Sequence, residues 1–277
     1  MIELLLAVVA GALIGLSLGA LGGGGSVLAV PVLLALGQSP AQATTGSLVV
    51  VGVTSLAGAV TARRAGSVLL ARGITFGTVA IGGAVAGAHL SSAVPDPVLL
   101  AAFSALMLVV ASLMTVRLLR NRRRSRGDHS SPVERPRLDD PIITFSPTFM
   151  CQCPRALKVL VTATVVGMLT GFLGVGGGFL VVPALVLALA LPMRYAAGTS
   201  LVVITITSTA ALAARAGVGV VPDWRLVAAL TTTAVAGSVL GARLAARTDT
   251  TRLSAAFTGL VLAVAAYVAA QALPALV

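Results

Sequence analysis

The chain has 277 residues, of which 57% are hydrophobic and only 10% are charged, and its formal net charge is +11. Soluble domains carry about 25% charged residues, so this composition excludes a soluble protein and predicts an integral membrane protein. The apolar runs are too long for the alternating strands of a membrane barrel, so we expect helical spans of about 20 residues each.

Apolar segments follow one another in the same order in both halves of the chain. In the first half they cover residues 2–36, 43–61, 73–90 and 98–119, and in the second half 157–190, 196–214, 226–244 and 253–273. The sequence therefore predicts an all-α protein with about eight transmembrane helices in two homologous four-helix repeats, at 1–119 and 155–277. An even number of spans in each repeat makes the repeats parallel, related by an axis along the membrane normal, whereas an odd number, with a re-entrant piece counted as a span, would invert them.

The positive charge is concentrated in the hydrophilic stretch that joins the two repeats. Eight arginines lie between Arg117 and Arg137, as expected of a cytoplasmic loop, so we predict a basic cytoplasmic linker at 120–154 and no nucleic-acid partner. With four spans in each half, the side of the linker also collects Arg63, Arg64, Arg72, Arg215 and Arg225, whereas the other side collects Arg194, Arg243, Arg247 and Arg252. Both termini are then predicted to be cytoplasmic as well.

A run of glycines interrupts the first apolar segment of each half. Gly19-Ala-Leu-Gly-Gly-Gly-Gly-Ser-Val-Leu-Ala-Val-Pro31 returns as Gly171-Phe-Leu-Gly-Val-Gly-Gly-Gly-Phe-Leu-Val-Val-Pro183. Each glycine costs a helix interior about 1 kcal/mol relative to alanine, so the run predicts a broken or re-entrant helix. The short segment after each run is about half the thickness of the hydrocarbon core, which predicts a half-helix.

Interrupted helices at matching points of two repeats indicate the binding site of a transporter. A second interpretation is that the glycines only let two helices approach closely. Irregular backbone at membrane depth is tolerated where it is buried in protein or lines a watery cavity, which favours the first interpretation.

The acidic residues indicate the charge of the substrate. All eight lie at segment ends or in the linker, so a carboxylate site for a cation is not expected and the predicted substrate is an anion. Backbone N–H groups at the breaks, with nearby hydroxyls, an amide and an arginine, supply the donors, although any one hydroxyl can instead bond the backbone of its own helix. The candidate binding residues are Gly22, Gly23, Gly24, Gly25, Ser26, Gln42, Thr45 and Ser47, with Gly174, Gly176, Gly177, Gly178, Arg194, Thr199 and Ser200.

Two alternative functions stay open. Cys151 and Cys153 are the only cysteines, and a membrane sulfur-relay or redox protein would use this pair. With no further soft ligand nearby, a metal site is not expected, and neither a cofactor nor an enzyme active site is predicted. The second alternative is a channel-like anion pore gated by apolar constrictions.

The doubled glycine motif (Gly22 to Pro31 and Gly174 to Pro183), the sequence Ala197 to Leu201 and the doubled layout resemble the TauE/SafE sulfite exporter family. The resemblance implies a permease of small sulfur-containing anions, such as sulfite, thiosulfate or organosulfonates, in the bacterial cytoplasmic membrane. The first repeat departs from the motif at Thr44 to Ser47, and Ser26 stands where the second repeat has Gly178.

Overall fold

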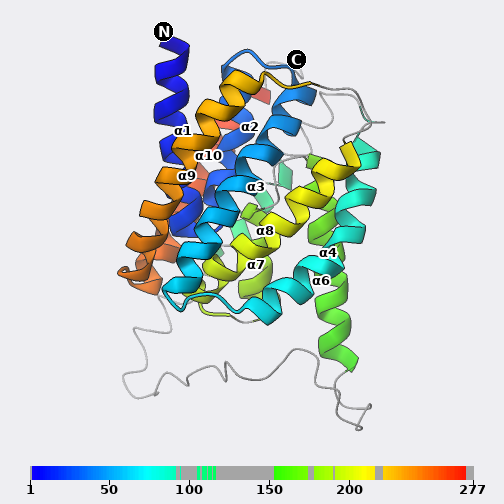
Figure 1. Ribbon diagram of the computed structural model, residues 1–277. Helices are drawn as coiled ribbons and strands as arrows, with labels where there is room; N and C mark the ends of the chain where they lie inside the picture. The colour runs from blue at the N-terminus through cyan, green and yellow to red at the C-terminus, as the bar shows by residue number, and fades with distance from the viewer. Residues whose placement is uncertain are drawn as a thin grey trace.

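The computed structural model describes residues 2–91, 94, 105, 106, 108–110, 112, 113, 115, 116, 153–173, 178–189, 191–215 and 221–272, and over these residues it is helical without strands. The helices are α1 (Ile2–Leu21), α2 (Gly24–Ala35), α3 (Pro40–Arg64), α4 (Leu70–Ser91), α6 (Cys153–Leu173), α7 (Gly178–Ala188), α8 (Met193–Arg215), α9 (Trp224–Ala246) and α10 (Thr250–Ala272), as Figure 1 shows. The predicted all-α fold is confirmed. The linker at 120–154 lies almost entirely outside the described residues, so the three domain boundaries stay a prediction.

The helices fall into two length classes. By length and composition, α3, α4, α8 and α9 are able to cross a membrane. By contrast, α2 has 12 residues and α7 has 11, so each rises through only about half of the hydrocarbon core. The predicted half-helices are thus present in both halves of the chain.

The glycine run of the first half makes a hairpin inside the protein. Helix α1 ends at Leu21, Gly22 has a φ of +73°, and α2 begins at Gly24. A Cβ atom on Gly25 would lie 2.0 Å from the carbonyl oxygen of Ile14, so α2 folds back tightly against α1. The prediction of a broken first segment is confirmed here, and close helix approach, the second interpretation of the glycines, holds as well.

The first helix of each half packs against the other half, α1 against α9 and α6 against α4, and α9 and α4 are themselves equivalent helices. A Cβ atom on Gly19 of α1 would lie 2.1 Å from the oxygen of Ser238 in α9, and one on Gly171 of α6 would lie 1.9 Å from the oxygen of Ala84 in α4. Gly19 and Gly171 are equivalent positions of the repeated motif. The same backbone contact therefore occurs twice, which is what an internal two-fold relation requires.

The two halves run in opposite directions through the bundle. Gly52 of α3 lies against Ser208 of α8, whereas Gly58 lies against Leu201, so these equivalent helices cross antiparallel. A two-fold axis that relates antiparallel helices lies across them, in the plane of the membrane. The prediction of parallel repeats is wrong, because the half-helices α2 and α7 each add a change of direction that a count of full spans leaves out.

The same geometry corrects the predicted sidedness. One cavity is lined by Ala62, Ser67, Arg194 and Ala246, so the end of α3, the start of α8 and the end of α9 lie at one end of the molecule. Arg194, Arg243, Arg247 and Arg252 therefore share the side of Arg63, Arg64 and Arg72, and not the opposite side. Helices α1 and α6 begin at opposite ends (Figure 1), so the prediction that both termini share the side of the linker is wrong.

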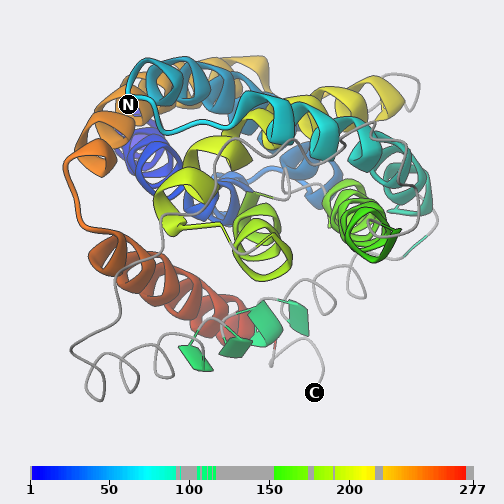
Figure 2. The same cartoon turned by 90° about the horizontal axis from the view of Figure 1, so that it is seen from below.

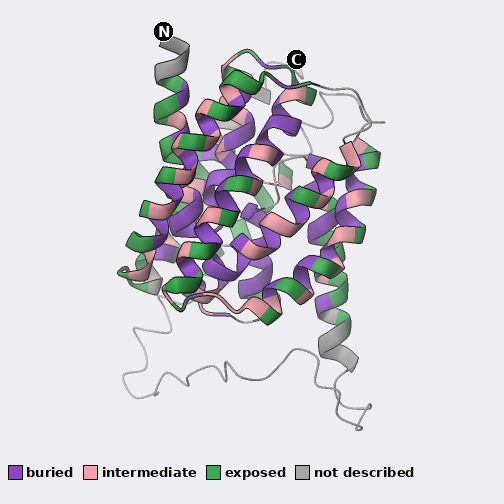
Figure 3. Cartoon of the chain, viewed as in Figure 1, coloured by how far each residue is buried: buried purple, intermediate pink, exposed green. Residues whose placement is uncertain are grey.

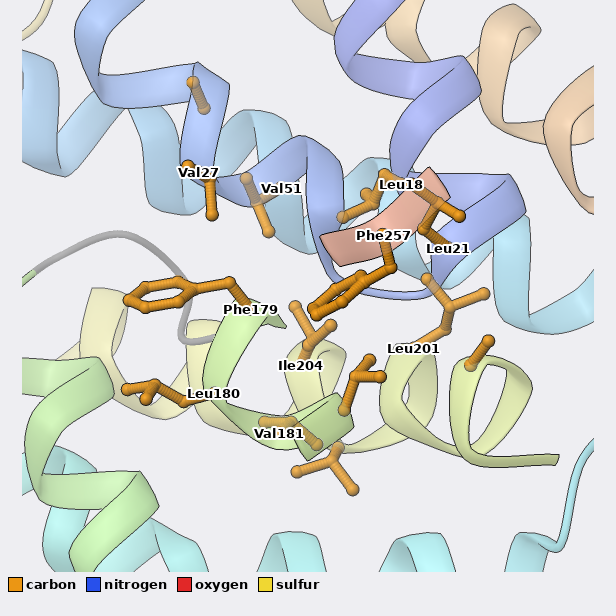
Figure 4. Packing of buried hydrophobic residues seen from close by; sticks show 14 of the residues in the cluster. Leu18, Leu21, Val27, Val51, Phe179, Leu180, Val181, Leu201, Ile204 and Phe257 are labelled. Carbon is orange, nitrogen blue, oxygen red and sulfur yellow. The ribbon is translucent and has the colours of Figure 1, made fainter. Parts of the chain in front are cut away.

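The half-helices form the interior of the bundle. Phe179 of α7 and Val27 of α2 are fully buried and lie near Ile204 of α8 and Phe257 of α10 (Figure 4). Exposed residues lie on the outer faces of the surrounding helices (Figure 3), and they include Leu13, Leu56 and Leu240, each more than half exposed. Seen along the bundle, α10 lies at its edge (Figure 2). A buried interior within an apolar exterior is the arrangement expected in lipid.

Candidate functional site

The first residues of α2 and α7 meet in the interior. A Cβ atom on Gly23 would lie 2.0 Å from the oxygen of Gly178, and one on Gly178 would lie 2.7 Å from Ser26 Oγ. Gly22 to Ser26 and Gly178 are buried. Glycine is thus required because the backbones of two half-helices from opposite halves of the chain touch. We call Gly22, Gly23, Gly24, Gly25, Ser26 and Gly178 the glycine junction.

A hydrogen bond from Ser200 connects the glycine junction to α8, a full-length helix. Its hydroxyl lies 2.7 Å from the oxygen of Gly22 and 2.7 Å from that of Ala197, and the side chain is fully buried. A serine hydroxyl has one hydrogen to donate. Because that hydrogen serves a carbonyl oxygen, Ser200 positions Gly22 in this conformation and is not a free donor for an anion.

At the glycine junction, the donors available for an anion are backbone N–H groups. The Ser26 hydroxyl donates to the oxygen of Gly23 at 2.8 Å, so it too is engaged. The N-cap residue of α2 is Gly23, which gives the helix no side-chain cap. The first N–H groups of a helix lack partners within it and lie at the positive end of its dipole. Free N–H groups at the positive end of a helix are able to bind a negative group.

Four predicted site residues make structural hydrogen bonds elsewhere. Gln42 closes a capping box with Ser39 and donates to the oxygen of Val221 at 3.1 Å. The hydroxyls of Thr45 and Ser47 donate to backbone oxygens of their own helix, and Thr199 Oγ1 accepts from the N–H of Leu69. The hydroxyls of Thr45 and Ser47 thus bond the backbone of their own helix, which was the alternative to a role in anion binding.

Arg194 lies at the mouth of the molecule rather than at the junction. It is exposed and lines the small cavity together with Gly19 and Ala197, at the end where α8 begins. The cavity has room for one water molecule at most. Gly174, Gly176 and Gly177 lie outside the described residues, as does Cys151, so their roles stay predictions.

The structure adds residues that the sequence analysis did not propose. Thr54 and Ser55 of α3 and Ser208 of α8 are fully buried, and their hydroxyls make no hydrogen bond. Arg215 turns inward from the last turn of α8 and donates to Thr44 Oγ1, Ser91 Oγ and the oxygen of Gly171. The sequence shows the charge of Arg215 but not its burial, because the burial depends on how three distant helices pack.

The described residues contain no group of three His, Cys, Asp or Glu side chains able to hold a metal ion. The features that are present are a hairpin in the first half, a half-helix at the matching place of the second half, and the contact of the two half-helices in the interior of an apolar helical bundle. Discontinuous helices at matching points of inverted repeats are typical of membrane transporters.

Comparison with known proteins agrees with this class. The family model described as sulfite exporter TauE/SafE matches residues 7–268, and this chain belongs to that family. A "Probable membrane transporter protein" of Xylella fastidiosa strain Temecula1 is 34% identical over 205 residues, which cover 73% of this chain and 70% of the relative. The "Probable membrane transporter protein YdhB" of Bacillus subtilis is 25% identical over 193 residues, covering 69% and 70%. No solved structure matches the chain.

The chain is therefore a multi-pass membrane protein of the transporter class.

Proposed function

We propose that this transporter carries small sulfur-containing anions, such as sulfite, thiosulfate or organosulfonates, and binds them at the glycine junction. The observation that supports this site most directly is the contact between Gly23 and Gly178, which brings together the first residues of two half-helices. Helix N-termini attract negative groups through free N–H groups and the helix dipole. The family name agrees with an anionic substrate.

The distribution of arginines supports an orientation in the membrane. Arg63, Arg64, Arg194 and Arg247 lie at one end, whereas Arg215 and Arg225 lie at the other. By the positive-inside rule the first end is cytoplasmic. In this orientation α6 begins at the cytoplasmic end, whereas α1 begins at the outer end.

The inverted relation supports a mechanism of alternating access. Inverted repeats exchange conformations when one element rocks against another around a fixed site. In this proposal the glycine junction is that site, and it opens in turn to the two sides. Ser200, which joins Gly22 to α8, is one of the contacts that would break or slide during the exchange.

The substrate proposal is tested by thermal denaturation of the purified protein with sulfite, thiosulfate, sulfoacetate, sulfate and acetate. A ligand at 100 times its Kd stabilises the native state by about 2.7 kcal/mol, so a substrate raises the unfolding temperature with a saturating dependence. We expect sulfite, thiosulfate or sulfoacetate to do so and acetate not to. Equal or absent shifts with all five anions would contradict the proposed substrate class.

Flux measurements in vesicles separate the carrier from the two alternatives. A carrier shows saturation and trans-stimulation, whereas a channel-like pore shows neither at modest substrate concentration. A sulfur-relay protein loses activity when Cys151 and Cys153 are both replaced by serine. We expect saturable, trans-stimulated flux that survives this double replacement.

A further inference from the structure

Arg215 is held inside the protein by neutral groups from three helices. Its Nη1 donates to Thr44 Oγ1 of α3 at 3.0 Å, and its Nη2 donates to Ser91 Oγ of α4 at 3.2 Å and to the oxygen of Gly171 in α6 at 3.1 Å. The Nε atom is buried and makes no hydrogen bond. On the edge of the guanidinium that carries Nε, the Nε–H donor therefore has no acceptor.

Among the described residues, no carboxylate forms an ion pair with Arg215. Within the described part of the chain, the ion pair between Arg252 and Asp249 is the one that forms, and it lies on the surface. Arg215 is partly buried, and a partly buried cation without a counter-charge loses solvation that neutral oxygens repay only in part. In a membrane protein such a charge marks a functional site. Arg194 and Arg225, by contrast, are exposed.

The position of Arg215 breaks the two-fold relation of the molecule. Gly171, which accepts from Arg215, is equivalent to Gly19, and Gly19 lines the small cavity at the other end. Ser91 of α4 likewise corresponds to Ala245 of α9, which lines that cavity too. The small cavity lies at the cytoplasmic end. The Arg215 side chain occupies the equivalent position at the outer end. Gly171 also lies three residues before the second glycine run.

We propose that Arg215 is a substrate-binding residue of the outer half of the pathway, where its guanidinium exchanges neutral acceptors for an oxyanion. This rests on the proposed function, which makes the substrate an anion. A planar guanidinium binds two oxygens of one oxyanion through parallel N–H bonds, and the edge that carries the unpaired Nε supplies them. The ligand class is a small anion with at least two oxygens on one centre, as in sulfite or a sulfonate.

The test compares Arg215→Gln, Arg215→Lys and the matched control Arg225→Gln in the purified protein, titrated with sulfite, thiosulfate and sulfoacetate. We expect Arg215→Gln to weaken binding at least about tenfold, since hydrogen bonds to charged groups are lost. Arg215→Lys keeps the charge but loses the fork, so its affinity is expected to lie between those of wild type and Arg215→Gln. Arg225→Gln keeps wild-type affinity, because a peripheral charge mainly attracts anions at long range.

The unfolding temperature without ligand separates a binding role from a structural one. Replacing an unbalanced, partly buried charge is expected to leave this temperature unchanged or to raise it. A purely structural Arg215 would give a lower temperature in Arg215→Gln and an intact anion-dependent shift, which would overturn the proposal. The binding results also separate this proposal from the proposed function.

If the wild-type protein shows no anion-dependent shift, both the proposed function and the role of Arg215 are contradicted. If the wild-type protein and both Arg215 variants bind the anions equally, only the role of Arg215 is contradicted. If Arg215→Gln does not fold, a wild-type affinity of Arg215→Lys overturns the proposal.

Discussion

At the scale of single residues, glycine serves two separable purposes in this protein. At Gly22 the backbone has a φ of +73°, and a Cβ atom would also lie 2.2 Å from the oxygen of Ala197. At Gly37 the φ is +84°, but nothing lies within 4 Å of the Cβ position. Both sites strain an L-residue, by about 1–2 kcal/mol, whereas only Gly22 adds a clash with the backbone of another helix.

Gly22→Ala and Gly37→Ala therefore form a matched pair. We expect Gly37→Ala to cost about 1–2 kcal/mol of unfolding free energy, and Gly22→Ala to cost at least 1–3 kcal/mol more through overpacking. Thermal denaturation of the two purified variants measures the difference. Equal losses would show that Ala197 does not contact the hairpin as described.

Ser200 gives a second prediction at this scale. Ser200→Ala removes the hydroxyl that bonds the oxygen of Gly22 and leaves that buried oxygen without this donor, at a cost of about 1–3 kcal/mol. The control is Thr209→Val, whose exposed hydroxyl bonds only the oxygen of Thr205 in its own helix. We expect the first change to lower the unfolding temperature and slow transport, and the control to do neither. Wild-type stability and flux in Ser200→Ala would remove Ser200 from the junction.

At the scale of elements, small residues determine which helices pack together. Gly83 and Gly82 are neighbours on α4, but a Cβ atom on Gly83 would lie 2.2 Å from the oxygen of Thr164 in α6, whereas one on Gly82 would meet nothing within 4 Å. Alanine at an open helical site gains about 1 kcal/mol of helix propensity over glycine. Alanine at a closed site forces α4 and α6 apart.

We therefore expect Gly82→Ala to raise the unfolding temperature slightly and Gly83→Ala to lower it by an amount equivalent to about 1–3 kcal/mol. Denaturation in detergent of both variants and wild type provides the measurement. If Gly83→Ala is as stable as Gly82→Ala, α4 and α6 are not in backbone contact.

The half-helices show what can be predicted from the sequence at this scale and what cannot. The break at Gly22 to Gly25 follows from composition, since helix interiors disfavour consecutive glycines, and the half-length of α2 follows from the short apolar segment after the run. The direction of α2 after the break does not follow, because a bent span and a hairpin have the same local sequence. That ambiguity is why the repeats were predicted to be parallel.

Arg215 illustrates the same limit for a side chain. Its charge at the end of a span is typical of a residue that faces the aqueous phase, and it was counted as such. Its inward turn is decided by acceptors on α3, α4 and α6, which are 171, 124 and 44 residues away in the chain. Contacts of that separation leave no local pattern in the sequence.

At the scale of the whole molecule, the inverted relation places Arg64 and Arg225 on opposite faces of the membrane. We expect Arg225→Cys, in a background with Cys151 and Cys153 replaced by serine, to react with a membrane-impermeant thiol reagent added outside intact cells. Arg64→Cys should react only after the cells are opened, because the arginine-rich end faces the cytoplasm. Outside labelling of both cysteines, or of Arg64→Cys alone, would contradict the orientation.

The central claim is that backbone N–H groups at the glycine junction hold the transported anion. The most direct test is a crystal structure with selenite, the selenium analogue of sulfite, located by its anomalous scattering. The account predicts an anomalous peak within hydrogen-bonding distance of the N–H groups of Gly24 and Gly25. Selenite that binds the protein but gives its peak elsewhere, or continuous helices through residues 19–31, would contradict the account.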